Sequence, residues 1–157
     1  MLDAGFLACK GRGQAVGRWS GRRGEDEQVA AELGWLAVAG ALGALSRYGM
    51  GALAYRTLGT ALPWGTLLVN VVGCFLLGFI MHYGLANAAL SRTVKLAVTV
   101  GFLGSFTTFS TFGYETLRYF ESGATTLALA NIALNLLVGL AAVWAGLALA
   151  RTVLGSL

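Results

Sequence analysis

Four long apolar stretches constrain the fold of this 157-residue chain more than any other feature. They cover residues 35–58, 64–86, 92–121 and 125–150. Each reaches the roughly 20 residues that an α-helix needs to cross the hydrocarbon core of a bilayer. Composition agrees, because 57% of residues are hydrophobic and 11% are charged, whereas soluble domains average about 25% charged. We therefore predict an all-α integral membrane protein with four transmembrane helices.

The chain outside these stretches is short and polar. Residues 1–33 are rich in glycine and arginine, and we predict that they form a disordered basic leader. The leader has no continuous apolar run of the kind that a signal peptide needs, so we predict no cleavage. Residues 34–152 would form the membrane domain and residues 153–157 a C-terminal tail. The basic residues behind the net charge of +4 are expected to face lipid headgroups or cytosol, with no nucleic-acid partner.

The third stretch contains an unusual polar segment, residues 101–112, with the sequence GFLGSFTTFSTF. Its glycines weaken a helix, and its hydroxyls can bond nearby carbonyls or face something polar. The whole stretch is also too long for one straight crossing. We predict a third helix that is broken at mid-membrane. Non-helical backbone is tolerated there only where it is buried in protein or lines a watery cavity, which indicates part of an ion or solute path.

Two charged residues away from the ends of the apolar stretches need an explanation. Arg47 is near the middle of the first, where a guanidinium is costly. It either attracts anions in an aqueous vestibule or snorkels to the membrane surface from a shifted helix. Glu115 is the acidic residue near the middle of the third stretch. It either pairs with Arg47 as a structural ion bridge or lines a pathway, and the sequence does not separate these interpretations.

Three asparagines also fall inside predicted helices: Asn70 in the second, and Asn131 and Asn135 in the fourth. The last two are four residues apart and so share a helix face. Each carboxamide offers two N–H donors, which suit an anion, and one oxygen, which suits a bond between helices. For Asn131 alone we favour the interhelical bond. Three such residues in one small bundle favour a polar track.

Phenylalanines recur every three residues at positions 106, 109 and 112 and so lie near one helix face. Such a stripe is usually packing. Here hydroxyls stand beside the rings, and the edge of a phenyl ring carries the positive part of its quadrupole. A small anion would be stabilised edge-on without a full positive charge, and such weak binding lets it leave again. The hydroxyl residues are Thr108, Ser110 and Thr111.

Taken together, these motifs resemble the Fluc, or CrcB, family of fluoride channels. The resemblance covers nearly everything after Trp35. The motifs that carry it are GALGALSRY at residues 40–48, PWGTLLVNVVG at 63–73 and GFLGSFTTFSTF at 101–112, followed by Glu115. The TTFSTF string together with Asn70 is the most specific part.

The resemblance implies a fold, an activity and a set of site residues. It implies four helices assembled as an antiparallel, dual-topology homodimer in a bacterial inner (plasma) membrane. It implies passive, fluoride-selective conduction that exports fluoride and lowers its cytoplasmic concentration, and a structural sodium ion (Na+) at the dimer centre. By position, Gly104 and Thr107 correspond to the residues whose backbone carbonyls hold that sodium. The fluoride-pathway positions are Asn70, Phe109, Ser110, Thr111, Phe112 and, with an amide where the family often has a hydroxyl, Asn135.

The leader bears on the partner of this chain. Without it, the basic residues of the two membrane faces are nearly balanced, as dual insertion requires. The leader adds five more basic residues to one membrane face. If it is expressed, the antiparallel partner is expected to be a paralogous sister chain of opposite bias instead of a second copy.

Two other classes of protein share some of these features. A proton-coupled multidrug transporter of four helices would need a titratable carboxylate for cationic substrates, and the first, second and fourth helices contain none. A non-transporting membrane scaffold would leave the asparagines and the Thr/Ser run without a role. We predict no enzyme, because the single histidine and two cysteines form no nucleophile with its base and no metal-ligand spacing.

Overall fold

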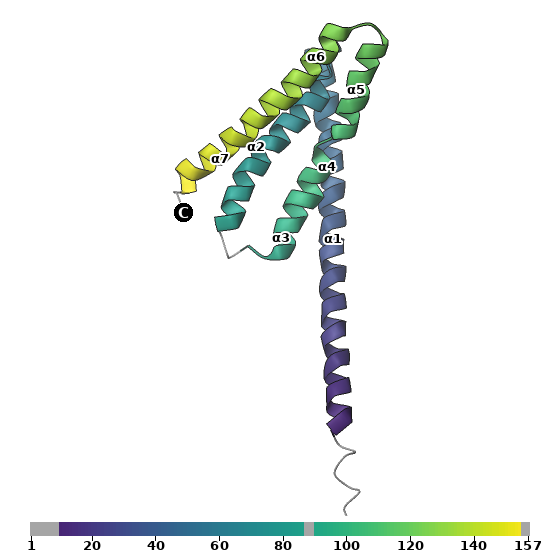
Figure 1. Ribbon diagram of the computed structural model, residues 1–157, viewed down its shortest axis with the longest axis vertical. Helices are drawn as coiled ribbons and strands as arrows, with labels where there is room; N and C mark the ends of the chain where they lie inside the picture. The colour runs from purple at the N-terminus through teal and green to yellow at the C-terminus, as the bar shows by residue number, and fades with distance from the viewer. Residues whose placement is uncertain (1–9, 87–89, 155–157) are drawn as a thin grey trace, which may run out of the picture. The chain divides into compact units, whose positions relative to one another are not determined.

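The computed structural model describes residues 10–86 and 90–154, and side chains within residues 26–82 and 90–153. The secondary structure over this part of the chain is entirely helical (Figure 1). Contacts divide the chain into two compact units, residues 1–34 and 35–157, each taken here by itself.

The first unit contains the leader for which we predicted disorder. The structure differs from that expectation over residues 10–33, which belong to helix α1 (Lys10–Leu58). Good helix formers account for the later part of this segment, since glutamate, alanine, glutamine and leucine dominate residues 25–33. Residues 1–9 of the leader lie outside the described residues, as do residues 155–157 of the predicted tail.

The second unit contains the remaining helices, several of which join end to end. The third apolar stretch is built from α3 (Arg92–Leu96), the π-helix η1 (Ala97–Leu103), α4 (Gly104–Phe106) and α5 (Phe109–Glu121). The second stretch is the single helix α2 (Trp64–Ala86). The fourth stretch is built from α6 (Thr125–Ala133), the π-helix η2 (Leu134–Val138) and α7 (Gly139–Leu154).

Four of these helical stretches are long and apolar enough to cross a membrane: Asp26–Leu58, Trp64–His82, Arg92–Glu121 and Thr125–Val153. The prediction of an all-α chain with four such helices is therefore confirmed for the described residues. The predicted boundaries at residues 64, 92, 121 and 125 coincide with the observed ones. The two π-helical turns were not predicted, because they replace one hydrogen-bond register with another and leave no mark on hydropathy.

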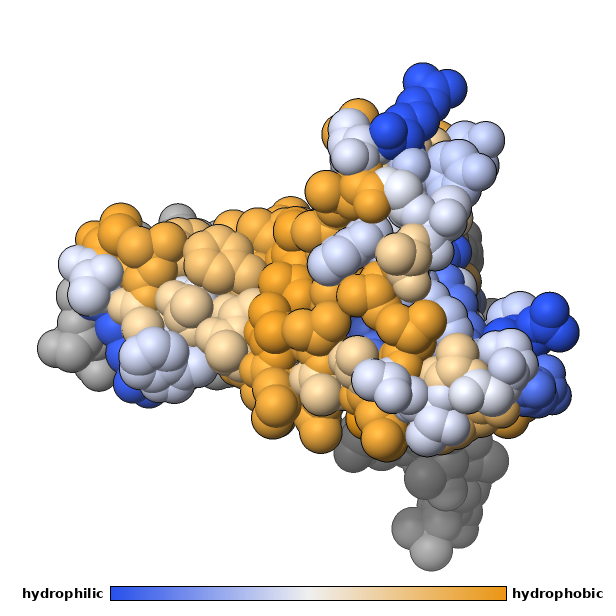
Figure 2. Space-filling model, turned by 90° about the horizontal axis from the view of Figure 1, so that it is seen from above, coloured by the Kyte–Doolittle hydropathy of each residue, from blue (hydrophilic) through white to orange (hydrophobic). Residues whose placement is uncertain are grey.

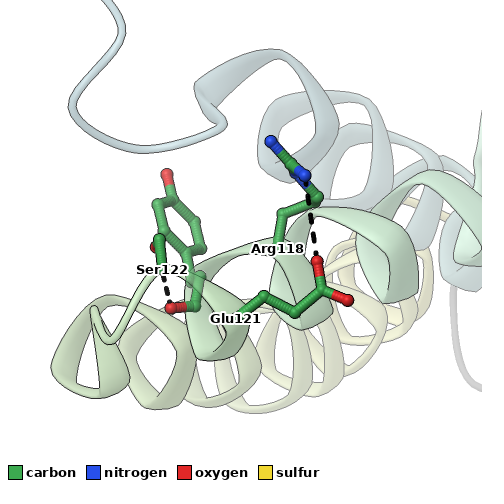
Figure 3. Close-up of polar contacts among 4 residues, drawn as sticks. Arg118, Glu121 and Ser122 are labelled. Carbon is green, nitrogen blue, oxygen red and sulfur yellow. Dashed lines mark hydrogen bonds and ion pairs between the residues drawn. The ribbon is translucent and has the colours of Figure 1, made fainter.

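Glycines in the left-handed conformation end two of the helices. Gly59 follows α1 and Gly123 follows α5, each with φ of 77°. At the second site the N–H of Ala124 donates to the carbonyl of Tyr119 at 2.9 Å, and the N–H of Gly123 to that of Phe120 at 3.0 Å. This pair of bonds is a Schellman motif. The Ser122 hydroxyl also donates to the Tyr119 carbonyl at 3.0 Å (Figure 3). The turn between α5 and α6 is thus short and fully bonded.

Helices α2 and α7 run side by side and form the most extensive helix pair of the second unit (Figure 1). A Cβ atom on Gly78 would overlap the backbone of Val143, and one on Gly146 would overlap the backbone of Phe75. The two backbones are therefore close enough that only glycine fits at these points. Small residues serve this purpose in membrane helices, where packing replaces the hydrophobic effect.

Many large apolar side chains of the second unit point outward. Leu137 and Trp144 of the fourth stretch are 63% and 70% exposed. In the space-filling view a continuous apolar area occupies the middle of the face shown, with hydrophilic residues at its edges (Figure 2). An apolar exterior of this kind suits lipid, and with four span-capable helices it marks a multi-pass membrane protein.

Candidate functional site

Two consecutive residues with extended backbone separate α4 from α5. Thr107 has φ and ψ of −83° and 159°, and Thr108 has −150° and 115°. Thr108 then caps α5, because its side-chain oxygen accepts the N–H of Thr111 at 3.3 Å. The predicted polar segment thus contains a non-helical dipeptide with a helix start directly after it.

A side chain from α2 bonds both backbone groups of the second residue of this dipeptide, Thr108. Asn70 accepts the N–H of Thr108 on Oδ1 at 2.8 Å and donates from Nδ2 to the carbonyl of Thr108 at 3.2 Å. One carboxamide therefore pairs with both backbone groups of one residue, as a neighbouring strand would. Unpaired backbone groups raise the free energy strongly where water is absent. This contact therefore stabilises the extended conformation of Thr108 within an apolar protein.

The same contacts take two backbone N–H groups away from their usual helical acceptors. In a continuous α-helix the N–H of Thr108 would donate to Gly104 and the N–H of Thr111 to Thr107. Here the first N–H is bonded to Asn70 and the second to the hydroxyl of Thr108. Gly104 and Thr107, the two residues that we predicted to hold sodium, are thus among the residues at this interruption whose carbonyls lack their usual helical donors.

A cavity of about 500 Å³ lies beside this dipeptide. Its lining includes four of the six predicted pathway residues: Asn70, Phe109, Phe112 and Asn135. The rings of Phe109 and Phe112 have centroids 5.5 Å apart and planes inclined by 56°, and Phe109 is 82% exposed. Amide groups and phenyl rings therefore line one cavity. Gly104 and Thr107 line the same cavity.

The other two predicted pathway residues gather around the Thr108 hydroxyl. Its oxygen lies 2.9 Å from the hydroxyl of Thr111 and 3.3 Å from that of Ser110. Thr111 lines a second cavity of about 580 Å³, and Thr108 lines both cavities. Ser110 lines neither. The four polar residues of the six are thus connected by hydrogen bonds by way of Thr108, but the structure does not place all six in one cavity.

Arg47 and Glu115 both line the second cavity. Oε1 of Glu115 accepts the hydroxyl of Thr66 at 2.8 Å. Among the side chains that the structure describes, Glu115 Oε2 is buried without a hydrogen-bond partner. The carboxylate is therefore bonded to Thr66 and not to Arg47, and the alternative of an ion bridge within one chain is not observed.

Three threonines of this region have contacts that the sequence did not indicate. Thr66 holds Glu115, Thr108 carries the backbone contacts of the dipeptide, and Thr116 accepts the amide of Asn131 at 2.9 Å. Thr66 lies four residues before Asn70 and so shares its helix face, a spacing that would have indicated its place. The bond between Asn131 and Thr116 agrees with the interhelical role that we favoured for Asn131.

The helices and these polar cavities define a class: a small multi-pass membrane protein with hydroxyl and amide groups collected inside an apolar bundle. Comparison with known proteins gives the family. Residues 34–147 match the model of the family described as CrcB-like protein, Camphor Resistance (CrcB). The chain belongs to this family, which confirms the resemblance noted from its motifs.

Relatives with similar sequences carry a common name. A protein of Geobacter sp. (strain M21) is 43% identical over 120 residues, which are 76% of this chain and 97% of that protein. One from Dehalococcoides mccartyi (strain CBDB1) is 50% identical over 111 residues, or 71% and 85% of the two chains. One from Syntrophotalea carbinolica is 49% identical over 117 residues, or 74% and 95%. Each is named "Fluoride-specific ion channel FluC".

Proposed function

We propose that this protein is a fluoride-selective passive ion channel that exports fluoride down its electrochemical gradient and lowers its cytoplasmic concentration. Family membership and the common name of the relatives support the proposal. The structural observation that carries it is the single cavity that Asn70, Phe109, Phe112 and Asn135 line together.

The chemistry of this cavity suits a small anion. Carboxamide N–H groups and the edges of phenyl rings present partial positive charge, and neither brings a fixed charge that would hold the ion. A channel needs binding strong enough for entry and weak enough for exit. We propose that Ser110 and Thr111 continue the polar route from this cavity toward the second one, where Arg47 attracts anions.

The interruption at Thr107 and Thr108 is proposed to lie near the middle of the membrane. The third stretch, Arg92–Glu121, has 30 residues, and the interruption falls close to its midpoint. Both backbone groups of Thr108 are bonded to Asn70, which lowers the cost of non-helical backbone at membrane depth.

We further propose an antiparallel homodimer in a bacterial inner membrane, with a structural sodium ion at its centre. Hard cations prefer oxygen ligands, and Gly104 and Thr107 fit, because each has a carbonyl that lacks its usual helical donor. Two carbonyls from one chain are few for such an ion, and a two-fold axis would supply the set twice. When bound, sodium would supply a positive charge that draws the carbonyls together.

The orientation of the chains is open to a direct test. A cysteine at Ser122, in the turn between α5 and α6, would be placed in a background with Cys9→Ser and Cys74→Ala. A membrane-impermeant thiol reagent should label it from both sides of the cell membrane if orientation is dual. Labelling from one side only would favour pairing with an oppositely oriented sister chain.

An ion-flux assay on liposomes tests the proposed activity. Purified protein should pass fluoride and not chloride. Phe112→Ile removes a ring that lines the cavity, and Asn70→Asp replaces N–H donors by a carboxylate that repels anions; both should abolish most of the flux. Phe120→Ile is the matched control, because Phe120 lies on the same helix and lines neither cavity. Equal passage of the two halides, or unchanged flux in both variants, would reject the proposal.

The same assay separates the other two classes. A multidrug transporter would move cationic dyes with the proton gradient, whereas a membrane scaffold would pass neither halide.

A further inference from the structure

A chain of hydrogen bonds leads from the first cavity into the protein. Its far end consists of Asn131, 2% exposed, and Thr116, 8% exposed, which line neither cavity. Nδ2 of Asn131 donates to the Thr116 hydroxyl at 2.9 Å. That hydroxyl donates in turn to the carbonyl of Phe112 at 2.8 Å. Two buried polar residues are thus bonded to the backbone of a residue whose ring faces the cavity.

The near end of this chain joins two asparagines of the cavity wall. Nδ2 of Asn135 donates to Oδ1 of Asn131 at 3.0 Å and to its backbone carbonyl at 3.1 Å. Nδ2 of Asn70 donates to Oδ1 of Asn135 at 2.9 Å. We call the series Asn70, Asn135, Asn131 and Thr116 the amide relay. It connects α2, the fourth apolar stretch and α5.

Backbone groups at both ends give the amide relay one direction. The N–H of Thr108 can only donate, so it requires Oδ1 of Asn70. The carbonyl of Phe112 can only accept, so it requires the proton of Thr116. Between them every carboxamide donates toward Thr116. Turning one carboxamide over would bring two oxygens or two NH₂ groups face to face, which is costly for buried groups.

This direction decides what an anion meets in the cavity. Both N–H groups of Asn70 are shared with protein oxygens, one with Asn135 and one with Thr108. An arriving anion would exchange with one of these oxygens and would not meet the repelling Oδ1. If Asn70 were turned over, its oxygen would face Asn135 and the cavity.

We infer that Asn131 and Thr116 are positioning residues for fluoride conduction: through the amide relay they keep Asn135 and Asn70 in the orientation that offers N–H groups to the ion. The inference rests on the proposed function. It assigns these two residues a role in conduction although neither lines a cavity.

Hydroxyl removal at the far end is the first test, with flux measured in liposomes. Thr116→Val keeps the shape of the side chain and removes the acceptor of Asn131. Fluoride flux should fall roughly tenfold, the ratio that corresponds to about 1.4 kcal/mol. Thr116→Ser keeps the hydroxyl and should retain most of the flux. Thr57→Val is a matched control, because Thr57 also donates to a carbonyl four residues earlier, at 2.9 Å, but lies outside the relay.

A double substitution separates positioning from packing. Asn131→Leu alone should lower the flux about as much as Thr116→Val, because either change breaks the same relay. The two together should lower it no further than the stronger one alone, since residues that act as one unit are not additive. If Thr116→Val does not assemble, the fluoride flux of Asn131→Leu is compared with that of Thr57→Val instead.

The outcomes distinguish the inference from the proposed function. A wild-type protein that passes no fluoride overturns both. A conducting wild type with equal flux in Thr116→Val, Thr116→Ser and Thr57→Val overturns the relay alone. Independent, additive losses at Thr116 and Asn131 also overturn it, because they indicate two separate packing effects. Loss of flux with rescue by serine and without additivity supports it.

Discussion

Helix α2 makes two close contacts of different kinds. On one side its backbone meets the backbone of α7 at Gly78 and Gly146. On the other, Gly73 lies against the side chain of Thr107, and Asn70 bonds the backbone of Thr108. The first contact is apolar and has no side chain that can move aside. The second is polar and includes movable side chains, so we expect the α7 contact to govern stability and the Thr107 contact to govern conduction.

The largest effect is expected from the contact with α7. Gly146→Ala places a methyl group against the backbone of Phe75, and overpacking of this kind costs about 1–3 kcal/mol of unfolding free energy. Thermal unfolding in detergent, followed by tryptophan fluorescence, measures the loss. Gly49→Ala is the control, because a Cβ at Gly49 meets nothing within 4 Å. Equal unfolding temperatures of Gly146→Ala and Gly49→Ala would contradict the distinction between the two sides of α2.

A smaller loss of stability and a clear loss of flux are expected at Gly73. A Cβ there would overlap Cγ2 of Thr107 and so displace the extended dipeptide. We expect Gly73→Ala to lower fluoride flux by about tenfold, a barrier change near 1.4 kcal/mol. Thr107→Ser removes Cγ2 and keeps the hydroxyl that bonds the Leu103 carbonyl. The double variant should therefore recover flux, and failure to recover would show that Gly73 acts in another way.

The cap of α5 should have a moderate effect. Thr108→Val removes the oxygen that accepts the N–H of Thr111 and that contacts the hydroxyls around it. Loss of such a cap costs about 1 kcal/mol, so unfolding should occur at a slightly lower temperature. Thr108→Ser retains the oxygen and should unfold with the wild type. A valine variant as stable as the serine variant would show that the cap is dispensable.

The smallest effect is expected at the surface. Arg118 and Glu121 form an ion pair at 3.8 Å, with side chains 66% and 57% exposed (Figure 3). Such pairs contribute about 0–1 kcal/mol. Arg118→Ala should therefore change neither flux nor unfolding measurably when compared with wild type at moderate salt. A large change would place this pair within the functional region, contrary to the distinction drawn above.

Hydropathy predicted the helices well because lipid imposes a simple rule of length and polarity. The second, third and fourth stretches begin where expected, at Trp64, Arg92 and Thr125. Asn70, Phe109 and Phe112, which the family resemblance assigned to the fluoride pathway, line one cavity. Their roles in conduction stay predictions.

What the sequence did not predict depends on contacts between distant segments. Thr66 and Glu115 are 49 residues apart, and Asn131 and Thr116 are joined only because α5 and α6 form a tight hairpin. The helical conformation of residues 10–33 was missed for another reason, because composition rich in charge and glycine suggested disorder more strongly than local propensity suggested helix.

The contact between Asn70 and Thr108 has a consequence for biosynthesis. Asn70 leaves the ribosome 38 residues before its partner. Until the two helices meet, nothing supplies the N–H of Thr108 with an acceptor except its own helix, so the nascent third segment is expected to enter the bilayer as one uninterrupted rod. The extended dipeptide then forms late, when the second and third segments pack together. A chain that lacks the Asn70 side chain should therefore insert into the membrane normally but reach the final packed structure less often.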